Sequence, residues 1–148
     1  KRMNAKAESL GMTSTYYLND TGLDESGNKG GAYGSAIDQA RLAEYIIKNY
    51  PTLLSATRKP SLNITSLDGI THMALNTNSI VALIPGLMVS KTGSTNIAGG
   101  NLIVIFDPEI GRSIIVSVLG STEEGRFDDV LKLVRASMKS IENSVRLD

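Results

Sequence analysis

Lys91, Thr92 and Gly93 stand together at the end of an apolar run that is typical of a β-strand. The lysine ammonium supplies positive potential, and the threonine hydroxyl can donate a hydrogen bond to an anion. Glycine has no Cβ, so a ligand backbone can lie close against the strand. These residue types suit a carboxylate receptor on a strand edge that adds a peptide as an extra strand. A strand that ends in a turn with a solvated lysine explains the same tripeptide, which does not decide between the two interpretations by itself.

The elements around this triplet are predicted to form an antiparallel sheet packed by helices. Three β-prone runs, at 86–92, 101–106 and 113–119, are separated by connections rich in turn residues and should pair as an antiparallel meander. The later two runs are nearly continuous in apolar residues, which indicates that both of their faces are covered. Apolar residues at three- and four-residue steps from Phe127 to Val145 predict a covering helix of about five turns. The fold class is therefore α/β in the loose sense (α+β).

The beginning of the chain predicts a helix followed by a long loop. Helical spacing over 1–12, closed by Gly11, comes without an N-cap residue. We interpret this as a helix entered in its middle, in a piece of a longer protein, although a frayed natural terminus explains the feature equally well. Residues 13–34 are rich in Gly, Asn, Asp and Ser and predict a long loop of the kind that is usually functional.

A second helix and a hairpin are predicted between this loop and the sheet. Ser35 can cap the helix, and Pro51 ends it. Two β-prone runs follow within 60–75, separated by Asp68-Gly69, a dipeptide that predicts a hairpin with a type I′ turn.

Composition excludes several classes of function. The 148 residues include 15 Lys+Arg and 15 Asp+Glu, so no positive field indicates nucleic acid or anionic lipid as a partner. The absence of cysteine excludes a thiolate nucleophile, and a single histidine excludes a multi-histidine zinc site. No apolar run approaches the roughly 20 residues that span a bilayer. A phosphate-binding P-loop is rejected, because Ser90 stands where that motif requires glycine.

The residues around the triplet resemble a known family. KTGSTNIAGGNLIV is similar to the K-T-G-x-T-x-x-A-G-x-x-L signature of the D-alanyl-D-alanine carboxypeptidases, the low-molecular-mass penicillin-binding proteins. Matching segments follow the family's order along essentially the whole chain: MNAKAESLGM, the stretch from Thr15 to Asp24, Ser35-Ala36 with Asp38, Asn76-Thr77-Asn78, and VLGSTEEGRFDD. A serine β-lactamase shares the fold and the Lys-Thr-Gly element, but the A-G-x-x-L continuation and the N-terminal matches favour the carboxypeptidase.

Two motifs of the family are not found in their expected context. The family's nucleophile lies in an S-x-x-K motif, followed by an S-x-N motif, and both precede the M-N-x-K-A segment. The resemblance therefore implies that both lie upstream of Lys1 and that 1–148 is the C-terminal part of one catalytic domain. The stretch 26–29 spells S-x-x-K in a glycine-rich loop, and 61–63 spells S-x-N at the head of a β-run. We interpret both as coincidence, and the lone His72 as a half-buried sheet histidine rather than part of a Ser-His-Asp site.

The resemblance implies a mechanism for the complete domain. An upstream serine, activated by its helical lysine, attacks the D-Ala-D-Ala bond of a peptidoglycan stem peptide, and water hydrolyses the acyl-enzyme. In that mechanism Lys91 lines the cleft and hydrogen-bonds toward the S-x-N serine. Thr92 holds the terminal carboxylate, and Gly93 admits the substrate strand.

The same resemblance implies three further site residues. The backbone N–H of Ser94 is one of two oxyanion donors, and Thr95 is a secondary polar contact. Arg126 assists the carboxylate, unless it is a surface charge of a first helical turn. The resemblance implies β-lactams as inhibitors, no cofactor, no metal, and a cell-envelope location with membrane association of the full-length protein. Without the missing N-terminal half we expect an inactive chain; the alternative is a non-catalytic peptidoglycan-binding or complementation fragment.

Overall fold

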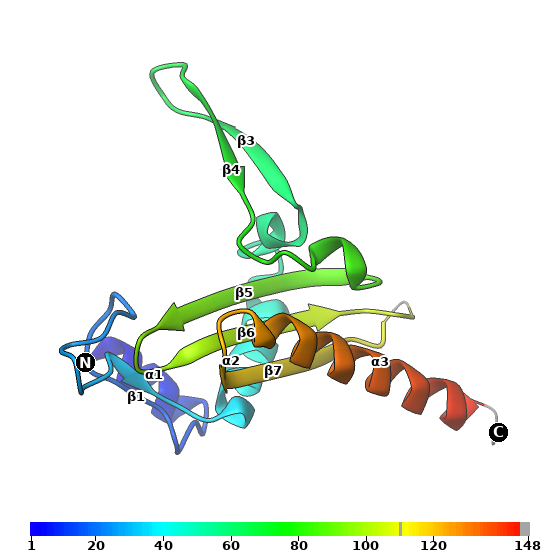
Figure 1. Cartoon of the computed structure of the whole chain (residues 1–148), viewed down its shortest axis with the longest axis horizontal. Coiled ribbons are helices and arrows are strands. Elements are labelled where there is room, and N and C mark those ends of the chain that lie inside the picture. Colours follow the sequence, from blue (N-terminus) through cyan, green and yellow to red (C-terminus); the bar gives the residue numbers. More distant parts are fainter. Residues whose placement is uncertain (110, 146–148) are drawn as a thin grey trace.

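A three-stranded antiparallel sheet forms the centre of the molecule (Figure 1). In the computed structural model, which describes residues 1–109 and 111–145, its strands are β5 (Leu87–Thr95), β6 (Gly99–Phe106) and β7 (Ile114–Ser121). The strand order β5-β6-β7 leaves β5 and β7 at the two edges. The predicted meander is confirmed, and β5 continues three residues beyond the predicted run, so that the whole triplet lies within a strand.

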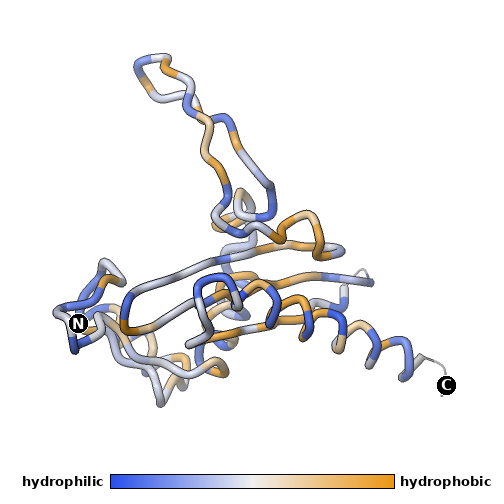
Figure 2. Tube along the Cα trace, in the orientation of Figure 1, coloured by the Kyte–Doolittle hydropathy of each residue, from blue (hydrophilic) through white to orange (hydrophobic). Residues whose placement is uncertain are grey.

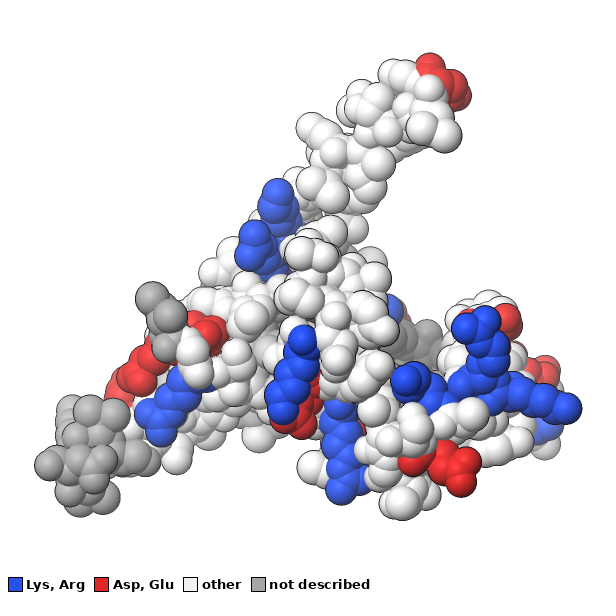
Figure 3. Space-filling view, turned by 180° about the vertical axis from the view of Figure 1, so that it is seen from behind, with Lys and Arg blue, Asp and Glu red and all other residues white. Residues whose placement is uncertain are grey.

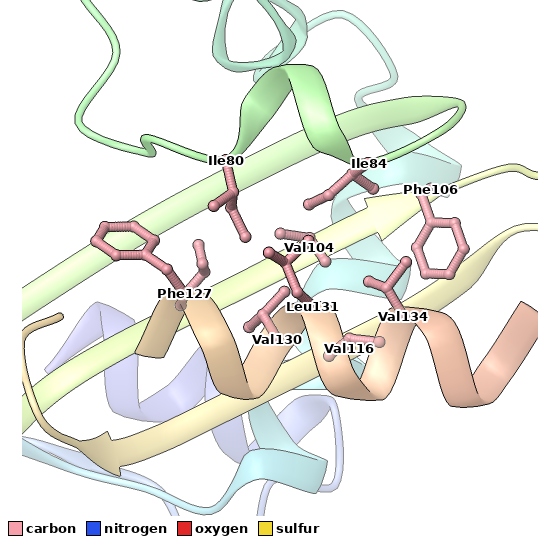
Figure 4. Close-up of a cluster of buried hydrophobic side chains, with 10 residues drawn as sticks. Ile80, Ile84, Val104, Phe106, Val116, Phe127, Val130, Leu131 and Val134 are labelled. Atoms are coloured by element: carbon pink, nitrogen blue, oxygen red, sulfur yellow. The ribbon is translucent and has the colours of Figure 1, made fainter. Parts of the chain in front are cut away.

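Each face of the sheet is covered by one helix. The helix α3 (Gly125–Val145) packs on one face, where Val104, Phe106 and Val130 belong to the larger apolar cluster (Figure 4). The helix α2 (Ala36–Asn49) packs on the other face through Ala43 and its neighbours. The predicted covering of both faces is confirmed for β6, whose alternate residues enter the two clusters. The predicted C-terminal helix is also confirmed; the side chain of Val145 lies outside the described part of the chain.

The N-terminal segment contains the predicted helix, but the predicted loop after it is not free of secondary structure. The helix α1 (Arg2–Ser9) has no side-chain cap at its start, and Gly11 follows it with a φ of 68°. The predicted loop 13–34 contains two short paired strands, β1 (Tyr16–Tyr17) and β2 (Ala32–Tyr33). Strands of two residues carry too little periodicity to be visible in the sequence.

The start of α2 is fixed by two side chains that the sequence places three residues apart. Ser35 caps the helix, because its Oγ accepts a hydrogen bond of 3.2 Å from the Asp38 N–H. The Asp38 carboxylate, 1% exposed, accepts hydrogen bonds from the Ser14 N–H, the Thr15 hydroxyl and Arg41. Burial acts to raise the pKa of Asp38, but the hydrogen bonds from Thr15 and Ser14 and the charge of Arg41 outweigh it and leave that pKa below its usual value.

A hairpin formed by β3 (Ser61–Thr65) and β4 (Thr71–Leu75) projects away from the central sheet (Figure 1). The predicted hairpin is confirmed, but the predicted type I′ turn is wrong. That turn needs a positive φ at both central residues. Only Gly69, with a φ of 84°, has one, and its N–H donates to the Ser66 carbonyl at 3.0 Å. The connection is a longer loop with glycine in the left-handed position, because Asp68 avoids the strained conformation.

Apolar residues occur along the hairpin (Figure 2), and their side chains are exposed on both of its faces. Leu67, at the tip, is fully exposed, and Ile64, Met73 and Leu75 are at least half exposed. Charged side chains lie at the base and the tip of the hairpin (Figure 3). At its base the short 3-10 helices η1 (Ser55–Arg58) and η2 (Val81–Leu83) lie beside the chain that leads into β5.

Candidate active-site strand

The outer edge of β5, which faces away from β6, presents backbone N–H groups that can be assigned to particular residues. The Ser90 N–H donates to Thr57 Oγ1 at 3.0 Å and therefore points away from β6. The register between β5 and β6 is continuous from Val89 to Thr95. Because N–H groups alternate between the two edges of a strand, those of Thr92 and Ser94 point to the same outer edge as that of Ser90. Ser94 is exposed, so its N–H is placed where a ligand could reach it.

The side chains of the triplet lie on opposite faces of β5. Thr92 pairs with Leu102, which belongs to the cluster under α3, whereas Lys91 pairs with Ile103, which packs toward α2. Lys91 is exposed, and its Nζ donates to the Thr92 carbonyl oxygen. The ammonium therefore lies beside the outer edge of the strand, where it supplies positive charge.

The Thr92 hydroxyl has a partner that the sequence did not predict. Thr92 Oγ1 lies 2.6 Å from Thr77 Oγ1, and either hydroxyl can be the donor. Thr77 belongs to the Asn-Thr-Asn stretch that leads from β4 to η2. Because one hydroxyl of this pair donates to the other, the second hydroxyl keeps its hydrogen free to donate to an anion. The only signal in the sequence was the resemblance of the stretch to the family, which gave no role to its threonine.

Arg126 is buried beside the triplet. Its side chain, on the first turn of α3, is 7% exposed, and its guanidinium donates to the Gly93 carbonyl at 2.9 Å. The alternative of a surface charge is therefore wrong. In the described part of the chain no carboxylate pairs with Arg126, and its Nε–H has no hydrogen-bond partner. A buried cation without an anion is costly, so this position favours the arrival of an anionic ligand.

Gly93 has space for a side chain on the protein side. A Cβ added there would meet only the Asn101 Cβ, at 3.8 Å, which is an ordinary contact. Its backbone also has no positive φ that would require glycine. The packing of this chain thus gives no reason for glycine at position 93.

Thr95 is hydrogen-bonded to a carboxylate that lies far from it in the sequence. Its hydroxyl donates to Asp24 Oδ1 at 2.9 Å and accepts from the Ala98 N–H at 3.0 Å, and the Ile97 N–H donates to Asp24 Oδ2 at 3.2 Å. Both oxygens of Asp24 therefore hold the turn between β5 and β6. The Thr95 hydroxyl has a structural task in this arrangement, and Asp24 is a positioning residue that sequence reasoning gave no role.

The other candidate catalytic residues do not join this site. Ser26 and Lys29 face each other across a tight turn and not along a helix, in agreement with the interpretation of that motif as coincidence. The stretch 61–63 lies on the projecting hairpin, as the β-run predicted. His72 is exposed on β4, so the prediction of a half-buried histidine is wrong: the hairpin packs against nothing in the described chain that would cover it.

The described residues offer no metal site, and a hollow beside α1 lies away from the predicted site residues. Among them, no three His, Cys, Asp or Glu side chains gather closely enough to hold a metal ion. A hollow of about 530 Å³ lies beside α1, where it is lined by Met3, Met12 and Leu42 among others, and none of the predicted site residues lines it. No helix in the described ranges is long and apolar enough to cross a membrane.

Comparisons with known proteins agree with the fold and the motifs. The family model for D-alanyl-D-alanine carboxypeptidase matches residues 1–123. The D-alanyl-D-alanine carboxypeptidase DacF of Bacillus subtilis is 31% identical over 134 residues, which cover 90% of this chain and 33% of DacF. DacB2 of Mycobacterium tuberculosis is 31% identical over 124 residues, 84% of this chain and 41% of DacB2.

Solved structures give the same result. The ampicillin-bound form of penicillin-binding protein D2 from Listeria monocytogenes superposes with a TM-score of 0.77 at 33% identity, over 90% of this chain and 53% of that one. PBP3 of Streptococcus pneumoniae gives a TM-score of 0.75 at 28% identity, over 93% and 46%. The chain thus spans well under half of the curated relatives and about half of these solved structures. With a family model matched from residue 1 to residue 123, the chain belongs to the D-alanyl-D-alanine carboxypeptidase family.

Proposed function

We propose that this chain supplies the carboxylate-binding wall and one oxyanion donor of a serine D-Ala-D-Ala carboxypeptidase. The complete enzyme would trim peptidoglycan stem peptides in the cell envelope, with a nucleophile and its lysine that lie upstream of Lys1. The observation that carries the proposal is the outer edge of β5, where the exposed Ser94 N–H and the Thr92 hydroxyl flank a glycine that the fold does not need.

The edge of β5 can hold an extended peptide. Backbone groups of Thr92 and Ser94 face outward, so a peptide can pair with them as a fourth strand. In this arrangement the scissile carbonyl lies at the Ser94 N–H, which stabilises the negative charge that develops on its oxygen. The bare Cα of Gly93 lets the two backbones approach.

The terminal carboxylate lies at the Thr92 end of the same edge. The Thr92 hydroxyl donates to it and accepts from the Thr77 hydroxyl, while Lys91 and the buried Arg126 contribute positive potential. Arg126 donates to the Gly93 carbonyl and brings its positive charge to this part of the strand. In the complete mechanism Lys91 also hydrogen-bonds toward the S-x-N serine. The acyl-enzyme forms on the upstream serine as D-alanine leaves, and water then releases the peptide.

A fluorescent penicillin tests where the nucleophile lies. We expect no covalent labelling of residues 1–148 alone, and labelling of an N-terminally extended form or of a mixture with the upstream half. Labelling of the 148-residue chain alone would mean that a serine within it is the nucleophile. No labelling of the extended form would favour a non-catalytic peptidoglycan-binding fragment.

Substitution of Thr92 tests the carboxylate assignment. In the extended form, Thr92→Val should lower kcat/KM for a peptide that ends in D-Ala-D-Ala by about ten- to a hundredfold, because a hydrogen bond to a charged group is worth about 1.5–3 kcal/mol. Thr77→Val should have a smaller effect in the same direction. Thr71→Val is the matched control, since Thr71 lies on the projecting hairpin. Unchanged turnover in Thr92→Val would show that the carboxylate binds elsewhere.

A further inference from the structure

The outer edge of β5 is closed at one end. At Ser90 the N–H donates to Thr57 Oγ1 at 3.0 Å and the hydroxyl donates to the Thr57 carbonyl at 2.8 Å. Ser90 is 2% exposed, whereas Ser94 on the same edge is exposed. The short helix η1 therefore occupies the position that a pairing strand would take beside Ser90, two residues before Thr92.

Hydrogen bonds from the base of the hairpin keep η1 in this position. Asn76 Nδ2 donates to the Thr57 carbonyl at 2.8 Å and to the Lys59 carbonyl at 2.9 Å. The Thr57 hydroxyl in turn donates to the Leu54 carbonyl at 2.6 Å. The residue after Asn76 is Thr77, whose hydroxyl contacts Thr92. Hydrogen bonds, together with the peptide bond between Asn76 and Thr77, thus connect the closed end of the edge to the carboxylate position.

We propose that Thr57, held by Asn76, is a specificity-determining residue that limits the site to the C-terminal end of a peptide. The inference rests on the proposed function. A peptide with its scissile carbonyl at Ser94 and its next carboxylate at Thr92 runs antiparallel to β5. One further residue would have to lie beside Ser90, where the N–H is already bonded and η1 fills the space. The site therefore excludes peptides that continue beyond the leaving residue.

The experiment measures selectivity between two substrates in the N-terminally extended enzyme. Diacetyl-L-Lys-D-Ala-D-Ala is compared with the same peptide lengthened by glycine, and cleavage between the two D-alanines is followed by mass spectrometry. The variants are Thr57→Ala, which frees the Ser90 N–H, Asn76→Ala, which releases η1 from the hairpin, and Thr57→Ser, which keeps the hydroxyl. A ratio of the two kcat/KM values is independent of the fraction of enzyme that is folded, so a loss of stability does not obscure it.

We expect wild type to cleave the short peptide and to reject the lengthened one. Thr57→Ala and Asn76→Ala should raise the ratio of kcat/KM for the lengthened peptide over the short one by about tenfold, equal to about 1.4 kcal/mol. Thr57→Ser should retain the wild-type ratio. A ratio that stays at the wild-type value in both alanine variants would overturn the inference, while cleavage of the short peptide by wild type would leave the proposed function standing.

Discussion

Replacement of Gly100 by alanine is expected to destabilise the protein, whereas the same change at Gly93 is not. Gly100 pairs with Ser94 across the sheet. A Cβ at position 100 would lie 2.6 Å from the Thr122 carbonyl carbon, closer still to its oxygen, and 3.0 Å from the Glu123 Cα. All three are backbone atoms, so β6 or the segment after β7 must move. At Gly93 the nearest atom is 3.8 Å away.

The expected sizes follow from these clearances. Overpacking of this kind costs about 1–3 kcal/mol. In a chain of this length each kcal/mol lowers the Tm by about 2–4 °C, so Gly100→Ala should lose about 2–12 °C. Gly93→Ala should keep its stability or gain about 0.4–1 kcal/mol, because alanine restricts the unfolded chain.

Thermal unfolding followed by circular dichroism measures both variants against wild type. Gly93→Ala should nevertheless slow penicillin acylation in the extended form by about ten- to a hundredfold, since a methyl group on the strand displaces the ligand backbone. An unchanged Tm in Gly100→Ala would refute the close approach of β6 to residues 122–123. A Gly93→Ala variant with wild-type acylation would refute the assignment of that glycine to ligand approach.

Two further predictions concern stability. The lowered pKa of Asp38 gives stability that is fully present above its unfolded value of 3.8 and is lost as the pH falls through the folded value, so the Tm of wild type should fall on acidification more steeply than that of Asp38→Asn; parallel pH profiles would contradict this. Phe106→Ala, in the core beneath α3, should lose about 3–5 kcal/mol of unfolding free energy in urea. Leu67→Ala at the exposed hairpin tip should change it by less than about 0.5 kcal/mol, and equal losses in the two variants would show that the core is misassigned.

The sequence predicted those elements whose signals are local. The meander over 86–119, the helix that begins near Phe127 and the cap at Ser35 were all predicted, because periodicity and capping chemistry act within a few residues. The prediction of a type I′ turn at Asp68-Gly69 was wrong for a reason that the sequence alone does not show. The dipeptide favours that turn, but a longer loop spares the aspartate a positive φ.

The site was predictable only in part, because several of its contacts join distant segments. The triplet, Ser94 and Arg126 could be named from the motifs, and their functional roles stay predictions. The burial of Arg126 could not be derived, since it depends on how α3 starts against β5. Thr57 carries no motif, and the segment that ends at Asp24 resembles the family without giving that aspartate a role. Their importance arises from hydrogen bonds across 33 and 71 residues of sequence.

The carboxylate of Asp24 has a consequence for how this domain is assembled. The loop that carries it is synthesised more than 70 residues before the turn that it fastens. Contacts so distant in sequence carry a loop-closure entropy cost that is met when the two segments come together. The turn at the end of β5 is therefore completed only after the amino-terminal loop and the central sheet have met. The hydrogen bonds of Asp24 at this turn thus indicate whether the two halves of the chain are correctly packed.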